Sequence, residues 1–119
     1  MNIKLKRKIL YFNKYKIKCA IGKRGITSKK IEGDEKTPRG TFIFKSIFYR
    51  KDRISNIKSS LKKYIIKKNM GWCDDSSSRH YNKLIKFPFN LSAEKLWLKS
   101  KVYDVIIIIN YNLNPTIKN

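Results

Sequence analysis

The sequence predicts a mainly β domain with one minor helix. In the first third of the chain, apolar residues alternate with basic ones, and later apolar runs are short and rich in β-branched residues. Stretches of Gly, Pro, Ser and Asp separate these runs and indicate turns. The chain has 119 residues, of which 41% are hydrophobic, which is typical of one small folded domain rather than a disordered segment. We therefore expect residues 1–119 to form a single domain.

The N-terminal segment predicts an antiparallel meander. Residues 3–5 and 15–21 place apolar side chains at one parity and lysines at the other, which predicts strands with one face buried and one solvated. The apolar run at 9–12 predicts a third strand between them. The run Gly22-Lys23-Arg24-Gly25 predicts a turn, and residues 27–40 predict a loop.

The middle of the chain is less regular. Residues 41–49 are almost continuously apolar, which predicts a strand buried on both faces. Residues 50–68 leave two interpretations open. The spacing of Ile54, Ile57 and Leu61 is compatible with a helix, whereas Ile65-Ile66 is equally compatible with a brief strand.

The last third predicts a loop, a helix and a strong strand. Residues 71–82 are polar and predict a long surface loop, followed by a short extended segment at 84–89. Ser92 is a candidate N-cap, with Glu94 in the first turn, for a helix that ends at Leu98. Residues 103–109 are apolar throughout and predict a central strand before a turn-rich tail at 110–115.

The formal net charge of +21 invites an anionic partner, such as nucleic acid or an acidic polymer. However, the basic residues are 23 Lys and only 6 Arg, and Arg is the residue that reads bases and phosphates through its bidentate fork. Lys, Ile and Asn are abundant everywhere, as expected for an AT-rich coding sequence. A small basic RNA- or anionic-polymer-binding protein therefore stays the alternative hypothesis, and it predicts steeply salt-dependent binding.

Several chemistries have little support in the sequence. Cys19 and Cys73 lie far apart, and His80 is the single histidine, so we expect no metal site and two reduced thiols rather than a disulfide. The glycines do not have the spacing of a nucleotide-binding loop, so nucleotide binding has little support. The apolar stretch after the basic start is too short for an export signal, and the run at 105–109 is too short to span a membrane.

The segment Trp72-Cys73-Asp74-Asp75 carries the candidate site. An indole beside two carboxylates suits recognition of a sugar or a peptide ammonium group. The competing interpretation is that Trp72 attaches the loop to the core while Asp74 and Asp75 cap local amides. A catalytic pair of Cys73 and His80 is a weak hypothesis, because neighbouring carboxylates raise the pKa of a thiol.

Three groups of motifs resemble the L,D-transpeptidase (YkuD-like) family. They are Gly22-Lys23-Arg24-Gly25-Ile26 with Lys30–Phe42, which contains Glu32-Gly33-Asp34 and Thr37-Pro38-Arg39-Gly40-Thr41-Phe42; Gly71-Trp72-Cys73-Asp74-Asp75 with Tyr81-Asn82-Lys83; and Ser92–Trp97 with Tyr103-Asp104-Val105 and Asn110-Tyr111-Asn112. The resemblance covers nearly the whole chain in the family's order.

The resemblance implies a β-sandwich domain that acts on the stem peptides of peptidoglycan by cysteine acyl transfer, without metal or organic cofactor, at the cell envelope. It also implies that Trp72, Asp74 and Asp75 line the substrate cleft. The family's nucleophile lies in a Ser/Thr-x-Gly-Cys motif after a histidine, both downstream of the strand matched by residues 103–112. Neither Cys19, Cys73 nor His80 matches those positions. We therefore expect no catalytic residue in this chain, an incomplete domain, and no activity on its own.

Overall fold

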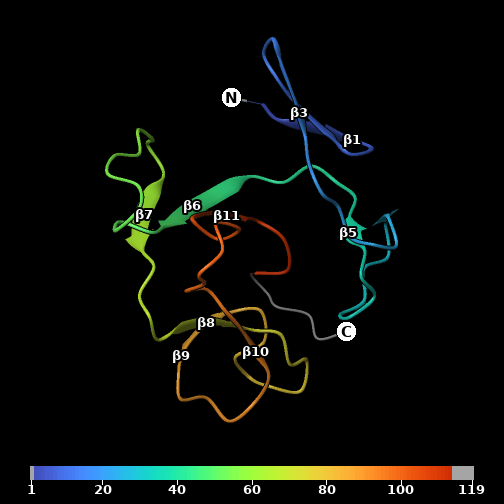
Figure 1. Cartoon of the computed structure of the whole chain (residues 1–119). Helices are drawn as coiled ribbons and strands as arrows, with labels where there is room; N and C mark the ends of the chain where they lie inside the picture. The colour runs from blue at the N-terminus through green and yellow to red at the C-terminus, as the bar shows by residue number, and fades with distance from the viewer. Residues whose placement is uncertain (1, 114–119) are drawn as a thin grey trace. The chain divides into compact units, whose positions relative to one another are not determined.

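The computed structural model describes residues 2–113, which form eleven β-strands and, within that range, no helix (Figure 1). The mainly β prediction is confirmed, and the predicted minor helix is wrong. Contacts divide the chain into two compact units, one that ends at Gly40 and one that begins at Thr41. No helix in the described range is long and apolar enough to span a membrane.

The predicted meander opens the first unit. Strands β1 (Lys4–Lys6), β2 (Ile9–Phe12) and β3 (Tyr15–Lys18) form an antiparallel sheet in the order β1-β2-β3. Two-residue loops connect them, and Arg7 and Asn13 begin these loops with φ of 58° and 50°. The expected buried face is wrong, because Leu5 is 38% and Ile17 is 54% exposed. All side chains of β1 and β3 are exposed, whereas those of β2 are half-buried.

The predicted loop at 27–40 contains a small parallel pairing between β4 (Ile26–Thr27) and β5 (Thr37–Pro38). Asp34 organises the turn between them, since its carboxylate accepts the backbone N–H groups of Ile31 and Lys36, both at 2.9 Å, and the Lys30 ammonium at 2.6 Å. A local carboxylate thus satisfies amide groups that no strand partner reaches.

The second unit contains two three-stranded sheets. In the first, β6 (Phe44–Tyr49) lies between β7 (Lys62–Ile65), which is parallel to it, and β11 (Val105–Ile109), which is antiparallel. Ile47 and Phe48 point to opposite faces of β6 and are 5% and 6% exposed, as expected for a strand buried on both faces. The central position predicted for residues 103–109 is wrong within the described sheet, because β11 is an edge strand there.

Arginine contacts, rather than a helix, organise the chain after β6. The Arg50 guanidinium is bidentate on Asp52 at 2.8 Å and donates to the Leu98 carbonyl at 2.8 Å. Arg53 donates to the Asp104 carboxylate at 2.8 Å. These long-range contacts outweigh the weak helical spacing of residues 54–65, so the helix interpretation is wrong. The alternative of a brief strand is closer, because β7 ends at Ile65.

The second sheet is antiparallel, in the order β10-β8-β9, and consists of β8 (Met70–Cys73), β9 (Leu84–Lys86) and β10 (Ala93–Lys95). The loop predicted from residue 71 therefore begins after Cys73. The helix predicted from Ser92 is also wrong: its hydroxyl donates to Asp74 Oδ1 at 2.6 Å instead of capping a turn. Pairing with β8 satisfies the backbone of residues 93–95 and overrides the local helix-start signal.

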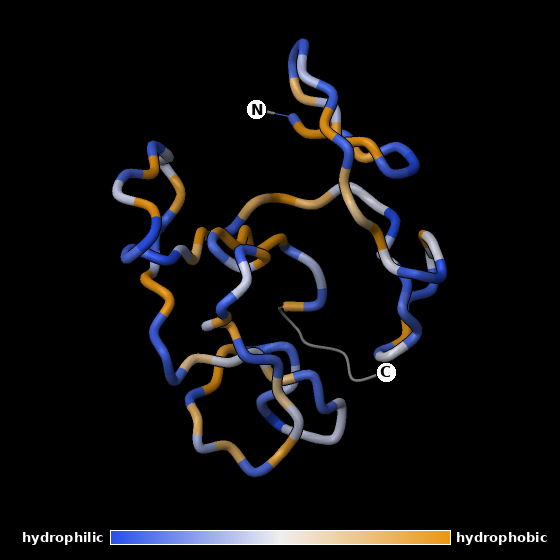
Figure 2. Tube along the Cα trace, viewed as in Figure 1, coloured by the Kyte–Doolittle hydropathy of each residue, from blue (hydrophilic) through white to orange (hydrophobic). Residues whose placement is uncertain are grey.

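One apolar cluster joins the two sheets of the second unit. Phe48, Ile66 and Leu96 are its buried centre, and Met70, Trp72, Trp97, Tyr103, Ile106 and Ile108 pack against it. Figure 2 shows hydrophobic stretches alternating with hydrophilic ones along the chain. The core of the second unit therefore draws on segments from both ends of that unit.

Candidate functional site

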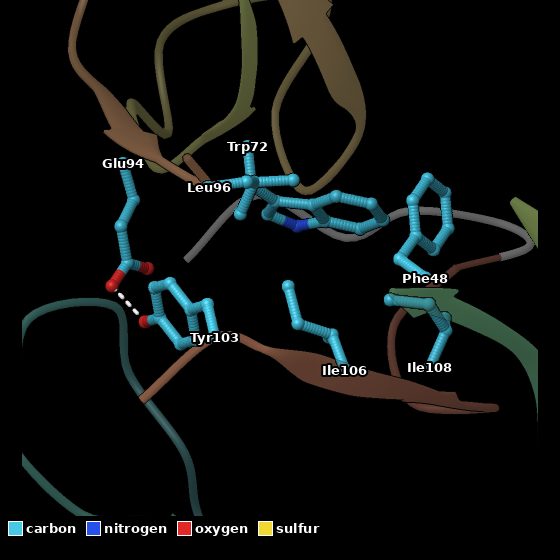
Figure 3. Close-up of a pocket in the computed structure, with 7 residues that line it drawn as sticks. All are labelled: Phe48, Trp72, Glu94, Leu96, Tyr103, Ile106 and Ile108. Atoms are coloured by element: carbon cyan, nitrogen blue, oxygen red, sulfur yellow. Dashed lines mark hydrogen bonds between the residues drawn. The ribbon is translucent and has the colours of Figure 1, made fainter. Parts of the chain in front are cut away.

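An apolar cavity of about 190 Å³ lies within the second unit. Its walls come from both sheets and from the segments beside them (Figure 3). The lining residues are Phe48, Trp72, Glu94, Leu96, Tyr103, Ile106 and Ile108. The volume lies below the roughly 300–1,000 Å³ of sites for drug-sized ligands, so it suits one aliphatic side chain rather than a whole peptide.

Trp72 and Glu94 are direct cross-strand partners on β8 and β10. Opposite residues of an antiparallel pair point to the same face of the sheet, so the Glu94 carboxylate and the Trp72 indole lie on one face. The hydroxyl of Tyr103 donates to Glu94 Oε1, as Figure 3 shows. Burial, with a smaller contribution from this hydrogen bond, raises the pKa of Tyr103 to about 12. The cavity is thus apolar inside and has a single carboxylate at its wall.

Asn82 connects the Trp72 segment to the end of β11. The Trp72 indole N–H donates to Asn82 Oδ1 at 2.9 Å, and Asn82 Nδ2 donates to the Asn112 carbonyl at 2.7 Å. Asn82 and Asn112 have φ of 56° and 51°, a conformation that asparagine tolerates better than most residues. Three segments that carry the family resemblance therefore meet at one side chain.

The two predicted aspartates lie outside the cavity lining. Asp75 Oδ1 accepts from the Ser77 hydroxyl at 2.6 Å and from the Ser77 N–H at 2.9 Å, and these bonds lower the pKa of Asp75. Asp74 accepts from the Ser92 hydroxyl. The structure brings only Trp72 of the three predicted residues to the cavity, and the capping interpretation accounts for the contacts of Asp75. A substrate-binding role for Asp74 and Asp75 stays a prediction.

Cys73 and His80 do not form a hydrogen-bonded pair in the described part of the chain. The Cys73 residue is 1% exposed, and its sulfur contacts the Asp75 carbonyl at 3.9 Å. His80 Nε2 accepts from Arg79 Nε at 3.3 Å, and the ring packs edge-on against Phe89. A thiol without a base and without access to solvent has no route to nucleophilic attack.

The sequence also predicted that the chain has no disulfide and no metal site. Cys19 and Cys73 are both free thiols in the structure. Between residues 2 and 113, no group of three or more His, Cys, Asp or Glu side chains is placed to hold a metal ion.

Motif segments also converge in the first unit. The Gly22 N–H donates to the Thr37 hydroxyl at 2.7 Å, and the Arg24 N–H donates to the Glu35 carbonyl at 2.9 Å. A Cβ built on Gly22 would lie 2.4 Å from the Glu35 carbonyl oxygen, so this approach requires glycine. Gly40 has φ of 151°, a backbone conformation that favours glycine. These contacts hold the segment that begins at Gly22 against the segment that contains Glu35 and Thr37.

No protein-family model matches the chain, and no curated protein or solved structure matches it significantly.

Sequence reasoning missed Glu94, Tyr103 and Asn82 as members of one cluster. Glu94 was expected in a helix, where it would not lie opposite Trp72. Ala93-Glu94-Lys95-Leu96 does not alternate between apolar and polar residues, and its two apolar residues lie three positions apart, which favours a helix. No local signal in this segment therefore indicates the strand.

Proposed function

We propose that the second unit is part of a β-sandwich of the L,D-transpeptidase type and binds the stem peptides of peptidoglycan at the apolar cavity beside Trp72. The convergence of Trp72, Asn82 and Asn112 carries this proposal. Each of these residues lies in a different motif of the resemblance, and the hydrogen bonds between them need all three motifs at once.

The chemistry of the cavity suits such a ligand. A stem peptide offers small aliphatic side chains and, in its diamino residue, an ammonium group. The walls provided by Phe48, Leu96 and Ile106 suit an aliphatic group, since burial of each methylene is worth about 0.8 kcal/mol. Glu94 suits the ammonium group, because charge-assisted hydrogen bonds are the strong ones.

We do not assign the acyl-transfer step to the described residues. Cys73 is buried and bonded to a backbone carbonyl, and Cys19 belongs to the unit that contains no histidine. Incubation of the chain with muropeptides is expected to give no turnover. A turnover that disappears in Cys73→Ala would contradict this part of the proposal.

Binding can be tested through the fluorescence of Trp72. The chain has two tryptophans, and Trp97 does not line the cavity, so a Trp97→Phe background reports on Trp72 alone. Titration with a stem tetrapeptide that contains a diamino acid is expected to change the emission saturably. Unchanged emission at millimolar peptide, in a protein with an intact circular dichroism spectrum, would overturn the proposal.

Neighbouring residues of β11 supply a matched control. Ile106 lines the cavity, whereas the adjacent Ile107 points to the other face and is 43% exposed. Ile106→Phe is expected to fill the cavity and abolish peptide binding, and Ile107→Phe to leave it unchanged. Equal effects of the two substitutions would show that the peptide binds elsewhere.

A further inference from the structure

The strand register of the N-terminal sheet separates its side chains into two chemically different faces. Lys4 pairs with Tyr11, which pairs with Lys16, and Lys6 pairs with Ile9, which pairs with Lys18. Direct cross-strand partners share a face. On one face of the sheet, four lysines therefore flank Ile9 and Tyr11 of the central strand. We call these six residues the lysine face.

The opposite face is apolar. It carries Leu5, Leu10 and Ile17 in one cross-strand row, and Phe12 and Tyr15 in the next. Charge and hydrophobicity are thus separated by the pleat of the sheet rather than mixed over its surface.

No acidic side chain balances the lysine face locally. Residues 1–31 contain nine Lys, two Arg and no Asp or Glu. All residues of β1 and β3 are exposed, so the four lysines are open to solvent. In the described part of the chain none of the four forms a salt bridge, so their charge is available to a ligand.

We propose that the lysine face binds single-stranded nucleic acid. The two lysine rows would contact phosphates, and the half-buried Tyr11 ring between them would stack on a base. Groove lysines combined with an aromatic platform are how sequence-tolerant single-strand binders work, and base stacking is worth about 1–3 kcal/mol per base. An AT-rich coding sequence alone would place lysines on both faces of the sheet. The concentration of lysines around Tyr11 therefore argues against that origin of the charge.

The geometry favours nucleic acid over an anionic membrane. A sheet that lies on a bilayer through Leu5 and Ile17 would turn the lysine face toward water, and the Tyr11 ring would have no partner there. A polyphosphate without bases would use the lysines but leave Tyr11 without a role.

The test measures binding of the full chain to a fluorescent 12-nucleotide oligo(U) by anisotropy over a range of salt. The substitution set K4Q/K6Q/K16Q/K18Q is compared with K51Q/K58Q/K99Q/K101Q, which removes the same charge from exposed lysines of the second unit. We expect the first set to weaken binding more than tenfold and to reduce the salt slope by about 3, at about 0.7 per phosphate contact. The control set is expected to weaken binding less than threefold.

A second pair of variants tests stacking without changing charge. Tyr11→Leu is expected to weaken binding at least fivefold, whereas Tyr15→Leu, on the opposite face, is expected to leave it within twofold. Equal losses in the two lysine sets would overturn the proposal, because binding would then follow net charge. The proposal would also be overturned if inorganic polyphosphate, or vesicles of phosphatidylserine and phosphatidylcholine, competed for the chain as well as unlabelled oligo(U) does.

Discussion

The indole N–H of Trp72 donates to Asn82 Oδ1 at 2.9 Å, and this bond joins the end of β8 to a residue ten positions further along the chain. The Asn82 side chain also donates a hydrogen bond to the Asn112 carbonyl, which follows β11. The wall of the cavity is therefore held by a side-chain network as well as by sheet pairing.

Removal of the indole donor should destabilise the second unit. Trp72→Phe keeps an aromatic ring in the cavity wall but leaves Asn82 Oδ1 without its donor, which should cost about 1–2 kcal/mol of unfolding free energy. Urea denaturation followed by circular dichroism measures the loss. Trp97→Phe is the control, because the Trp97 ring stacks on Arg50, with the guanidinium carbon 3.4 Å from the ring centroid, and phenylalanine keeps a ring there. A loss in the control as large as that in Trp72→Phe would argue against the hydrogen bond.

The roles of the oxygen and the nitrogen of the Asn82 amide can be tested separately. Asn82→Asp keeps the acceptor for Trp72 and tolerates the positive φ, but it replaces the donor to Asn112 with an oxygen that faces a carbonyl. We expect a loss of about 1–3 kcal/mol at neutral pH. The loss should diminish at acidic pH, where the carboxyl group becomes protonated and can donate. Denaturant midpoints at both pH values measure this, and equal losses at the two would contradict the assignment.

Tyr103 should titrate later than an ordinary tyrosine. Its folded pKa of about 12 lies above the ordinary value of 10.0, so its contribution to stability is complete below pH 10 and is lost as the pH rises through about 12. Ultraviolet absorbance of tyrosinate, compared between the wild type and Tyr103→Phe, isolates this group from the other six tyrosines. Glu94→Gln should shift the titration of Tyr103 to lower pH, because it removes a negative charge beside the phenol. An identical titration in Glu94→Gln would exclude Glu94 as a contributor.

Asp34 should make the turn between β4 and β5 sensitive to acid. Burial alone raises the pKa of Asp34, but hydrogen bonds from the Ile31 N–H, the Lys30 ammonium and the Lys36 N–H outweigh it and lower the pKa to about 2. A depressed carboxyl pKa contributes stability above the unfolded value near 4, and this is lost as the pH falls toward 2. A carboxyl chemical-shift titration measures the midpoint. Asp34→Asn should abolish the pH dependence of the Ile31 and Lys36 amide signals, and persistence of that dependence would assign it to another group.

The sequence predicted the N-terminal strands and the strand at 41–49, of which residues 44–49 form β6, because their signals are local. Alternation in Ile3-Lys4-Leu5 and the apolar run before Arg50 can be recognised without any partner. The helix predicted after Ser92 failed for the converse reason. The three residues of β10 become a strand only because β8 offers them hydrogen bonds, and no window around Ser92 contains that information.

By itself, the sequence determined the β-rich character, the strong positive charge and the placement of Trp72 in a candidate site, since these follow from composition and local pattern. The tertiary structure alone decided that Glu94, rather than Asp74 or Asp75, shares the cavity with Trp72. It also decided that β11 lies at an edge of the described sheet and that Cys73 is buried without a base. Each of these depends on which strands pair and in what register, and pairing is a free-energy balance over residues distant in the chain.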